Sequence, residues 1–265
     1  MPPGRAGGTS VGVHRRSTKG LPAHVHCIQS ALAPPSLHTP PLPPVHPPKA
    51  KLAPLSRRSL AEDATSLIRR AIIAGELPPG APLPETTLAE QLAVSRVPVR
   101  EALIAMEQEG LVEFDNRGRG RVRVFSEADF EDLFSMRCTL EVMAARLLSK
   151  RRGETTESDL QIMIEQQEAV VDLTELSLLD VSFHERIIRA ANHRPLAVCW
   201  KTIRSQIEFW LARAHRAQAA RHLSSVELTV PGHRRLLAEL FSGSEARAEN
   251  AMRTEMATWR EWLPS

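Results

Sequence analysis

Residues 88–112, which read LAEQLAVSRVPVREALIAMEQEGLV, constrain the fold of this chain more than any other segment. Ser95 is suited to cap a helix by accepting from a free backbone N–H, and Pro98 falls in the first turn, where a missing N–H costs little. We therefore predict that a helix begins near Arg96. Apolar residues then recur at helical spacing and predict one buried face, made of Val99, Ala102, Leu103 and Met106.

Another face of the same helix carries two arginines. Arg96 and Arg100 lie four residues apart and project together from the helix N-terminus. Their guanidinium groups suit bidentate contact with guanine edges or phosphates in a DNA major groove. A solvated helix face that carries two arginines is the alternative interpretation.

The segments on either side of this helix extend the pattern. Residues 60–72 and 85–93 have helical periodicity, Val94 and Ser95 form a turn, and Gly110 ends the Arg96 helix. Residues 111–125 change to a period of two around NRGRG, which predicts a β-hairpin. Such a hairpin is a basic wing positioned to follow phosphates or to enter a minor groove. Its basic residues are Arg117, Arg119, Arg121 and Arg123.

Overall charge does not by itself indicate a nucleic-acid partner. Residues 1–58 hold eight Lys or Arg and no acidic residue, whereas the whole 265-residue chain has a net charge of +3, so the remainder is net acidic. Residues 1–57 also hold 12 of the 20 prolines, which predicts a disordered arm. This arm either adds nonspecific phosphate affinity or is an ordinary extension.

The cysteine content and the hydropathy indicate in which cellular compartment the protein occurs. Three widely spaced cysteines favour neither a disulfide framework nor a thiolate zinc site. No apolar run approaches the roughly 20 residues of a membrane span. We expect a cytoplasmic protein with no membrane segment.

Apolar residues recur at helical spacing throughout the second half of the chain. A long helix from Phe130 to Leu147 is followed by predicted helices over 156–172, 175–193, 196–220, 224–242 and 244–262. Six helices in about 135 residues predict an antiparallel bundle. Almost no linker separates this bundle from the wing.

The segment LLDVSFHERIIRAANHRPL holds the most chemically suggestive residues of the bundle. Asp180 and His184 lie four residues apart on one helix face, where a carboxylate and an imidazole can bind one divalent cation. A surface hydrogen bond or a helix ion pair explains the same spacing. His233 and Glu255 belong to later helices and could face the bundle interior beside this pair.

The motifs of the first half resemble a known family. GELPPGAPLPETTLAEQLAVSRVPVREALIAMEQEGLV and NRGRGRV closely resemble the DNA-binding domain of the GntR family of bacterial transcriptional regulators, over about Leu60–Phe125. The resemblance implies a winged helix-turn-helix and a double-stranded operator. It also implies that operator DNA is contacted by Ser95, Arg96, Val97 and Arg100, with Gly118 at the wing tip. Val97 stands where members often carry a small polar residue, which affects the expected operator sequence.

The bundle resembles the effector domain, called the FCD domain, of the FadR subgroup of this family. The similar pieces are RCTLE at 137–141, DVSFH at 180–184, AANHRPL at 190–196 and GHRRLLAEL at 232–240. Many members hold a metal with one Asp and three His, of which Asp180, His184 and His233 are present here. Glu255 stands at the place of the last His. A divalent metal such as zinc, manganese or nickel is therefore expected, with harder metals favoured by the added carboxylate.

The resemblance also implies a small carboxylate effector held in the bundle. Arg137 is the candidate bidentate partner of that acid, and an internal salt bridge with Glu141 is its alternative role. Asn192 is the second candidate, with a helix cap as its alternative. Three histidines match no motif and are expected to be exposed, and the tryptophans are expected in packing or at a dimer surface. They are His193, His215 and His222, and Trp200, Trp210, Trp259 and Trp262.

We therefore predict a mainly α protein with three parts: a basic arm over 1–57, a winged helix-turn-helix over 58–126, and a helical effector-binding and dimerisation domain over 127–265. The predicted function is a homodimeric, ligand-responsive transcriptional regulator and not an enzyme. The alternatives are a metal-dependent enzyme acting on a small carboxylate and a DNA-binding protein without an effector. No nucleophile, separate general base or phosphate-binding glycine loop supports the enzyme.

Overall fold

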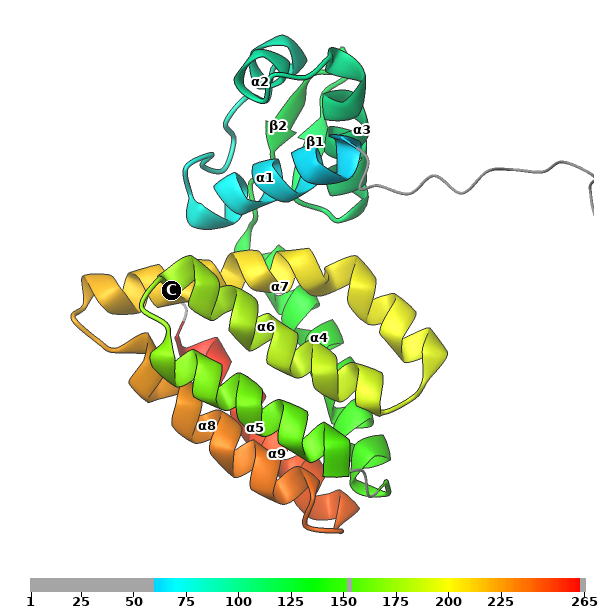
Figure 1. Cartoon of the computed structure of the whole chain (residues 1–265), viewed down its shortest axis with the longest axis vertical. Coiled ribbons are helices and arrows are strands. Elements are labelled where there is room, and N and C mark those ends of the chain that lie inside the picture. Colours follow the sequence, from blue (N-terminus) through cyan, green and yellow to red (C-terminus); the bar gives the residue numbers. More distant parts are fainter. Residues whose placement is uncertain (1–59, 152–153, 263–265) are drawn as a thin grey trace, which may run out of the picture. The chain divides into compact units, whose positions relative to one another are not determined.

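The computed structural model describes residues 60–151 and 154–262 (Figure 1). The predicted basic arm over 1–57 lies outside the described residues. None of the described helices is both long and apolar enough to span a membrane.

The first part of the described chain is the predicted winged helix-turn-helix. Its pattern of three helices and a hairpin is confirmed, and the elements are α1 (Leu60–Ala74), α2 (Glu85–Gln91), α3 (Arg96–Gln108), β1 (Val112–Phe114) and β2 (Gly120–Val122). The two strands are antiparallel, with Val112 opposite Val122 and Phe114 opposite Gly120. In the turn between α2 and α3, Ala93 has a positive φ of 53°, which reverses the chain within a few residues.

Apolar packing between α1 and α3 orients α3, the helix that is predicted to contact DNA. Ile68 and Ile72 of α1 and Leu103 and Met106 of α3 are almost completely buried. Leu83 donates its backbone N–H to Gly120 O at 2.9 Å, so the segment before α2 lies along the second strand of the hairpin. Helix α3 and the wing are therefore held in one small core.

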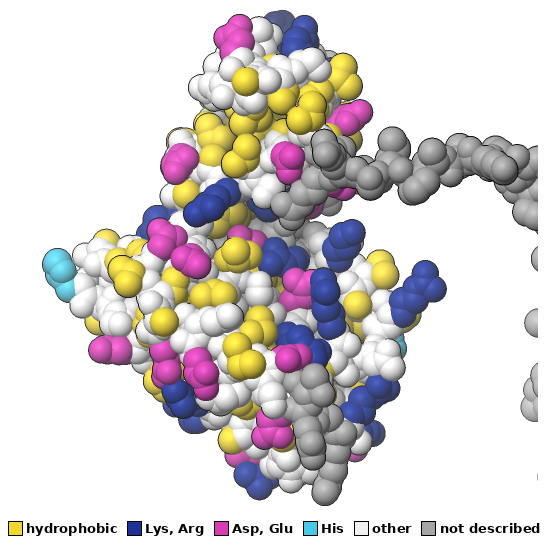
Figure 2. Space-filling view, in the orientation of Figure 1, with side chains coloured by type: hydrophobic (Ala, Val, Ile, Leu, Met, Phe, Trp, Pro, Cys, Tyr) yellow, Lys and Arg dark blue, Asp and Glu magenta, His cyan; other side chains and the backbone are white. Residues whose placement is uncertain are grey.

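The second part is the predicted bundle of six helices, with ends within a few residues of the predicted ones. They are α4 (Glu127–Ser149), α5 (Glu154–Ala169), α6 (Leu173–Ala190), α7 (Arg194–Ala220), α8 (Ser225–Leu240) and α9 (Glu245–Glu261). Helix α5 lies between α6 and α8 (Figure 1). Basic and acidic side chains are interspersed over the visible face of the bundle (Figure 2).

Helix α4 begins directly after the wing, and side-chain caps mark its start. Ser126 and Asp129 form a capping box, in which each side chain accepts from the other residue's backbone N–H. Arg123 of the wing forms an ion pair with Asp129. The near absence of a linker is therefore confirmed, and the wing is tied to the first turn of the bundle.

The bundle interior combines an apolar core with a group of buried charged and polar residues. Trp200, Trp210 and Trp259 pack in the core, as expected for tryptophans at helical positions. The expectation for His215 was wrong, because its side chain is completely buried between helices. The sequence did not predict its burial, since the position of a single histidine in a helix does not indicate whether its side chain faces the core.

Candidate functional site

The N-terminal turn of α3 presents the predicted DNA-contacting side chains to solvent. The helix begins at Arg96, as predicted, although the Ser95 hydroxyl accepts no N–H from the first turn. Arg96, Val97 and Arg100 are exposed, while Val99 on the opposite face is buried. The apolar face is therefore used for packing, and the basic face remains available for a ligand.

A surface groove of about 360 Å³ joins this turn to the wing. Arg96 and Arg100 line it from α3, and Arg117, Gly118 and Arg119 line it from the hairpin. The structure thus brings together five predicted DNA-binding residues that are separated by up to 23 positions in the chain.

Glu85, which the sequence analysis did not identify, organises the two arginines of α3. Its carboxylate accepts from Arg96 Nη2 at 2.9 Å and from Arg100 Nη1 at 3.0 Å. Both guanidinium groups remain about two-thirds exposed, with side-chain accessibilities of 65% and 60%. Exposed ion pairs of this kind contribute little net energy, so a phosphate or a base edge can replace the carboxylate.

Asp115 has the corresponding role in the wing. Its carboxylate accepts backbone N–H bonds from Arg117 and Arg119 and a side-chain bond from Arg119 Nε at 2.8 Å. These bonds, with the backbone N–H of Arg119 first, lower the pKa of Asp115 to about 2. Gly118 has a positive φ of 71°, which the tight turn requires and most side chains would resist. An aspartate just before a glycine-rich turn was the available sequence signal.

The predicted basic ribbon of the wing is more nearly neutral than its arginines indicate. Arg119 pairs with Asp115, Arg121 pairs with Glu113 at 2.8 Å, and Arg123 pairs with Asp129. The sequence pattern predicted these arginines but not their acidic partners. Each of these three guanidinium groups is held in place by a carboxylate.

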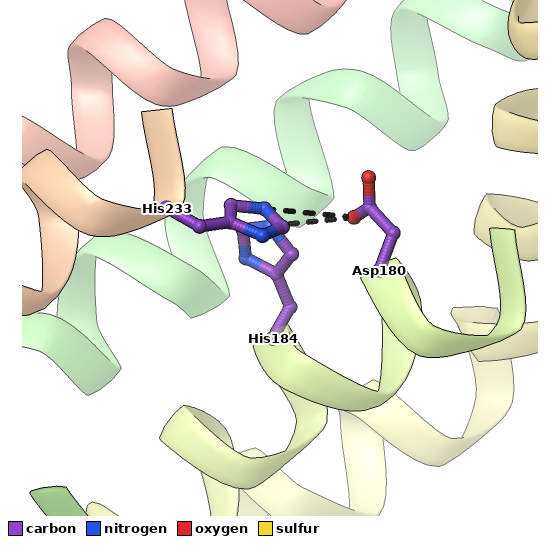
Figure 3. A group of neighbouring side chains, drawn as sticks. All are labelled: Asp180, His184 and His233. Carbon is purple, nitrogen blue, oxygen red and sulfur yellow. Dashed lines mark ion pairs between the residues drawn. The ribbon is translucent and has the colours of Figure 1, made fainter. Parts of the chain in front are cut away.

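Three of the four predicted metal ligands meet inside the bundle. Asp180 and His184 lie one turn apart on α6, and His233 reaches them from α8 (Figure 3). Their candidate ligand atoms all lie within 4.8 Å of one another. Asp180 Oδ1 is 3.6 Å from His184 Nε2 and 3.9 Å from His233 Nε2, and all three side chains are buried.

The partners of the two histidines leave their Nε2 atoms directed toward Asp180. His184 Nδ1 bonds to the Glu141 carboxylate, and His233 Nδ1 bonds to Gln167 Oε1 at 2.8 Å. A histidine ring that donates through Nδ1 has Nε2 available as a metal ligand when the ring is neutral. Burial, followed by the charge of His184, holds the pKa of His233 well below its usual value. Among the described residues, His233 Nε2 and Asp180 Oδ1 are buried without a hydrogen-bond partner, which fits a cation site.

Glu255, the fourth predicted ligand, lies beside this cluster. Its Oε1 atom is 3.9 Å from His233 Nε2, and burial raises its pKa to about 7. The carboxylate packs against Gly232, where an added Cβ would lie 2.3 Å from Oε2. Gly232 therefore leaves space for a glutamate at this position of α9.

The two candidate effector residues have different surroundings. Arg137 is buried, and its Nε donates to Glu141 Oε1 at 2.5 Å, so the anticipated internal salt bridge is present. Arg137 Nη1 is also buried and has no hydrogen-bond partner among the described residues, and the guanidinium lies over the Trp259 ring, 4.3 Å from its centroid. Asn192 is exposed and has a positive φ of 50° just after α6. The structure thus places Asn192 as a helix cap and does not bring it into the buried cluster.

Comparison with known proteins identifies the family. The description "Bacterial regulatory proteins, gntR family" matches residues 60–122, and the FCD domain matches residues 132–258. The Nta operon transcriptional regulator of Aminobacter aminovorans is 30% identical over 155 residues, which cover 56% of this chain and 74% of the relative. The chain belongs to the GntR family.

The chain is also similar to another bacterial regulator and to a solved structure. The gluconate operon transcriptional repressor of Bacillus subtilis is 29% identical over 167 residues, covering 62% of this chain and 68% of the relative. McbR/YncC of E. coli has the same fold, with a TM-score of 0.62 at 19% identity over 78% of this chain and 100% of that chain. The matching families and relatives are transcriptional regulators.

In this GntR-family regulator, α7 of the bundle contacts the ends of two helices of the DNA-binding domain. Glu109, just after α3, accepts from Ser205 Oγ at 2.7 Å and from Arg69 Nε at 2.8 Å. Gln206 Nε2 donates to the Glu109 carbonyl at 3.1 Å. Arg216 Nη1 donates to Ile73 O near the end of α1 at 2.7 Å.

The same part of α7 is also bonded to the helix that carries Asp180 and His184. Arg204, next to Ser205, donates to Glu185 on α6 at 2.7 Å and to Glu208 at 2.8 Å. Glu185 follows His184 in sequence. Hydrogen bonds from neighbouring residues of α7 therefore reach both the residue after His184 on α6 and the C-terminal end of α3.

Proposed function

We propose that this GntR-family protein is a transcriptional repressor that binds an operator through α3 and the wing and responds to a small carboxylate effector in its FCD domain. The observation that carries the DNA-binding part is the groove lined by Arg96, Arg100, Arg117, Gly118 and Arg119. In this protein groove, guanidinium groups from the N-terminus of α3 and from the hairpin surround one space. Binding to base edges in a DNA groove and to the flanking phosphates requires such an arrangement.

The proposed operator contacts come from side chains with different chemistry. Arg96 and Arg100 act as hydrogen-bond donors to guanine edges or phosphates, and the exposed Val97 packs against a thymine methyl group. Ser95 is exposed, and its hydroxyl is not used in capping α3. The wing arginines bind phosphates and position the domain.

The effector part of the proposal is supported by the buried polar cluster. Asp180, His184 and His233 would hold a divalent cation such as zinc, manganese or nickel, with Glu255 beside them. The cation would supply a Lewis acid that binds the carboxylate of the effector. The buried Nη1 group of Arg137, which has no hydrogen-bond partner among the described residues, would donate to the same carboxylate.

The response to the effector is proposed to pass through α7. An effector changes operator affinity only by binding one arrangement of the protein better than another. The hydrogen bonds from Ser205 and Gln206 to Glu109 would transmit a change in the position of α7 to the end of α3.

We propose a homodimer, because two copies of α3 on a pseudo-palindromic site double the contacts of one small domain. The role as a repressor follows the names of relatives such as the B. subtilis gluconate operon repressor.

The DNA-binding part is tested by Arg100→Ala. Genomic fragments that surround the gene are screened for a sequence that the protein protects in a footprint, and affinity is then measured by fluorescence anisotropy. Arg100→Ala should weaken binding to that site by about tenfold to a hundredfold, because one base or phosphate contact contributes about 1–3 kcal/mol. Arg234→Ala, which removes an exposed arginine of the bundle, is the matched control. An unchanged footprint in Arg100→Ala would contradict the proposal.

A further inference from the structure

A surface groove of about 360 Å³ runs between α8 and α9, which pack side by side (Figure 1). Its wall on α8 consists of residues at helical spacing from Gly232 to Glu239, and its wall on α9 extends from Arg247 to Glu255. Arg247 donates to both carboxylate oxygens of Glu239, at 2.6 and 2.9 Å, so one end of the groove carries an ion pair between the two helices. Gly232 and Glu255 lie at the other end.

This second end lies against the proposed metal site. Glu255 belongs to both places, because it lines the groove and its Oε1 atom is 3.9 Å from His233 Nε2. Burial is the first cause of the raised pKa of Glu255, and the charges of Asp180 in the bundle and of Arg235 in the groove also act on it. The Glu255 carboxylate therefore lies between the groove and the buried candidate ligands.

Glu255 differs from the three clustered ligands in two respects. Among the described residues, the candidate ligand atoms that lie within 4.8 Å of one another belong to Asp180, His184 and His233, and Glu255 is not in this set. Glu255 is 7% exposed, whereas each of the other three is 2% exposed or less. A carboxylate that lies outside the ligand set and reaches solvent is suited to contact a cation in passing.

Gly232 allows the carboxylate to occupy this position. An added Cβ at Gly232 would lie 2.3 Å from Glu255 Oε2 and 2.9 Å from Oε1. The carboxylate thus packs on the backbone of α8, one residue before His233. Any larger residue at position 232 would displace it from its place between the groove and His233.

We propose that the groove between α8 and α9 is the entry path of a divalent cation and that Glu255 is its gate, which receives the cation from the groove and passes it to Asp180, His184 and His233. This inference rests on the proposed metal site of the FCD domain. The three ligands are buried, so a cation reaches them only through the surface of the bundle. Removing water from a cation is costly, and a carboxylate that replaces this water lowers the barrier to entry and to exit.

Filling the groove tests the path. Stopped-flow absorbance of cobalt(II) at pH 8 measures uptake by the metal-free protein, and an excess of EDTA measures release. Thr254→Phe adds a ring at an exposed position of the groove and should slow uptake and release by the same factor, about fivefold or more, with Kd unchanged. Ala257→Phe, also exposed on α9 but outside the groove lining, should change neither rate. A smaller fall in Thr254→Phe, or slower uptake with a weaker Kd, would overturn the path.

Glu255→Gln distinguishes a gate from a fourth ligand. The amide keeps the shape and removes the charge, so loss of a gate should slow cobalt uptake by about fivefold or more without faster release. Loss of a fourth ligand would instead leave uptake unchanged and speed release by about tenfold or more. Glu249→Gln makes the same change on α9 outside this groove and is the control. Faster release, or uptake slowed by less than fivefold, in Glu255→Gln would overturn the gate.

A failure of the proposed metal site gives a different result from a failure of the gate alone. If the wild-type protein binds no cobalt, the metal site is wrong and the gate falls with it. If the wild type binds cobalt, Asp180→Ala combined with His184→Ala abolishes that binding, and Thr254→Phe and Glu255→Gln take up cobalt at the wild-type rate, then the metal site stands and only the gate is wrong.

Discussion

Arginine–carboxylate pairs occur in both functional regions of this protein, but in opposite environments. On the DNA-binding domain, Arg96 and Arg100 share Glu85 at the surface and stay about two-thirds exposed. In the bundle, Arg137 and Glu141 form a pair that is almost completely buried and extends to His184. Water screens the first pair, whereas the second pair lies in an interior of low dielectric constant, where charges interact more strongly.

The difference in burial separates two uses of the same chemistry. A surface pair contributes little energy and is easily exchanged, so it keeps a guanidinium oriented until DNA arrives. A buried pair cannot be opened without leaving an unpaired charge, so it fixes its neighbours. Although burial opposes ionisation of Glu141, the charges of His184 and Arg137 lower its pKa. The pairs at the start of α3 are thus exchangeable, whereas the buried pair holds the side chains beside the proposed effector site in place.

The largest expected effect lies in the buried region. Asp180→Ala combined with His184→Ala removes two of the three clustered ligands and should reduce bound divalent metal to background, since one histidine cannot retain a cation. Metal content is measured by plasma mass spectrometry after dialysis. Asp159→Ala, which removes a partly exposed partner of Arg186, is the control. Equal metal in the double variant and the wild type would refute the site.

A matched pair of substitutions compares the two environments directly. Glu141→Ala should lower the free energy of unfolding by about 3–5 kcal/mol, because it leaves Arg137 buried without its partner. Glu85→Ala should lower it by less than about 1 kcal/mol. Urea unfolding in the presence of a chelator measures both, so that metal loss does not contribute. Similar losses in the two variants would mean that burial does not distinguish these pairs.

The connection between the two regions gives a smaller effect. Gln206→Ala removes the bond from α7 to the Glu109 carbonyl. It should reduce the factor by which the effector changes operator affinity by about threefold to thirtyfold, as expected for a coupling contact of 0.5–2 kcal/mol. Anisotropy titrations with and without a carboxylic acid that binds the protein give this factor. Lys201→Ala, exposed on α7, serves as the control, and an unchanged factor in Gln206→Ala would exclude this route.

The smallest effect is expected at the exchangeable pair itself. Glu85→Gln removes a negative charge that competes with DNA for Arg96 and Arg100, so operator affinity should rise by about twofold to fivefold at low salt. The gain should shrink as salt increases, because screening weakens the competing charge. Glu90→Gln makes the same charge change at an exposed position of α2 and should have a smaller effect. A loss of affinity in Glu85→Gln would show that the positioning of the arginines by this carboxylate outweighs its competition with DNA.

Helical periodicity, glycine and proline placement, and local motifs were enough to predict the architecture. The Arg96 start of α3, the hairpin around Gly118 and the six bundle helices depend on short-range preferences. Asp180 and His184 were also predictable as neighbours, because four residues make about one turn. Longer-range relations were less accessible: Gln167 as a partner of His233 has no signal in the sequence.

The amino-acid sequence by itself determined the order of the elements, the arginines at the start of α3 and the candidate ligand types at Asp180, His184 and His233. Only the tertiary structure decided which side chains are paired and which are buried. Glu85 pairs with residues that follow it by 11 and 15 positions, and His215 lies inside the bundle against Ser177 of another helix. Local propensity acts over a few residues, whereas burial and pairing depend on how distant helices pack, so these features appear only when the chain is folded.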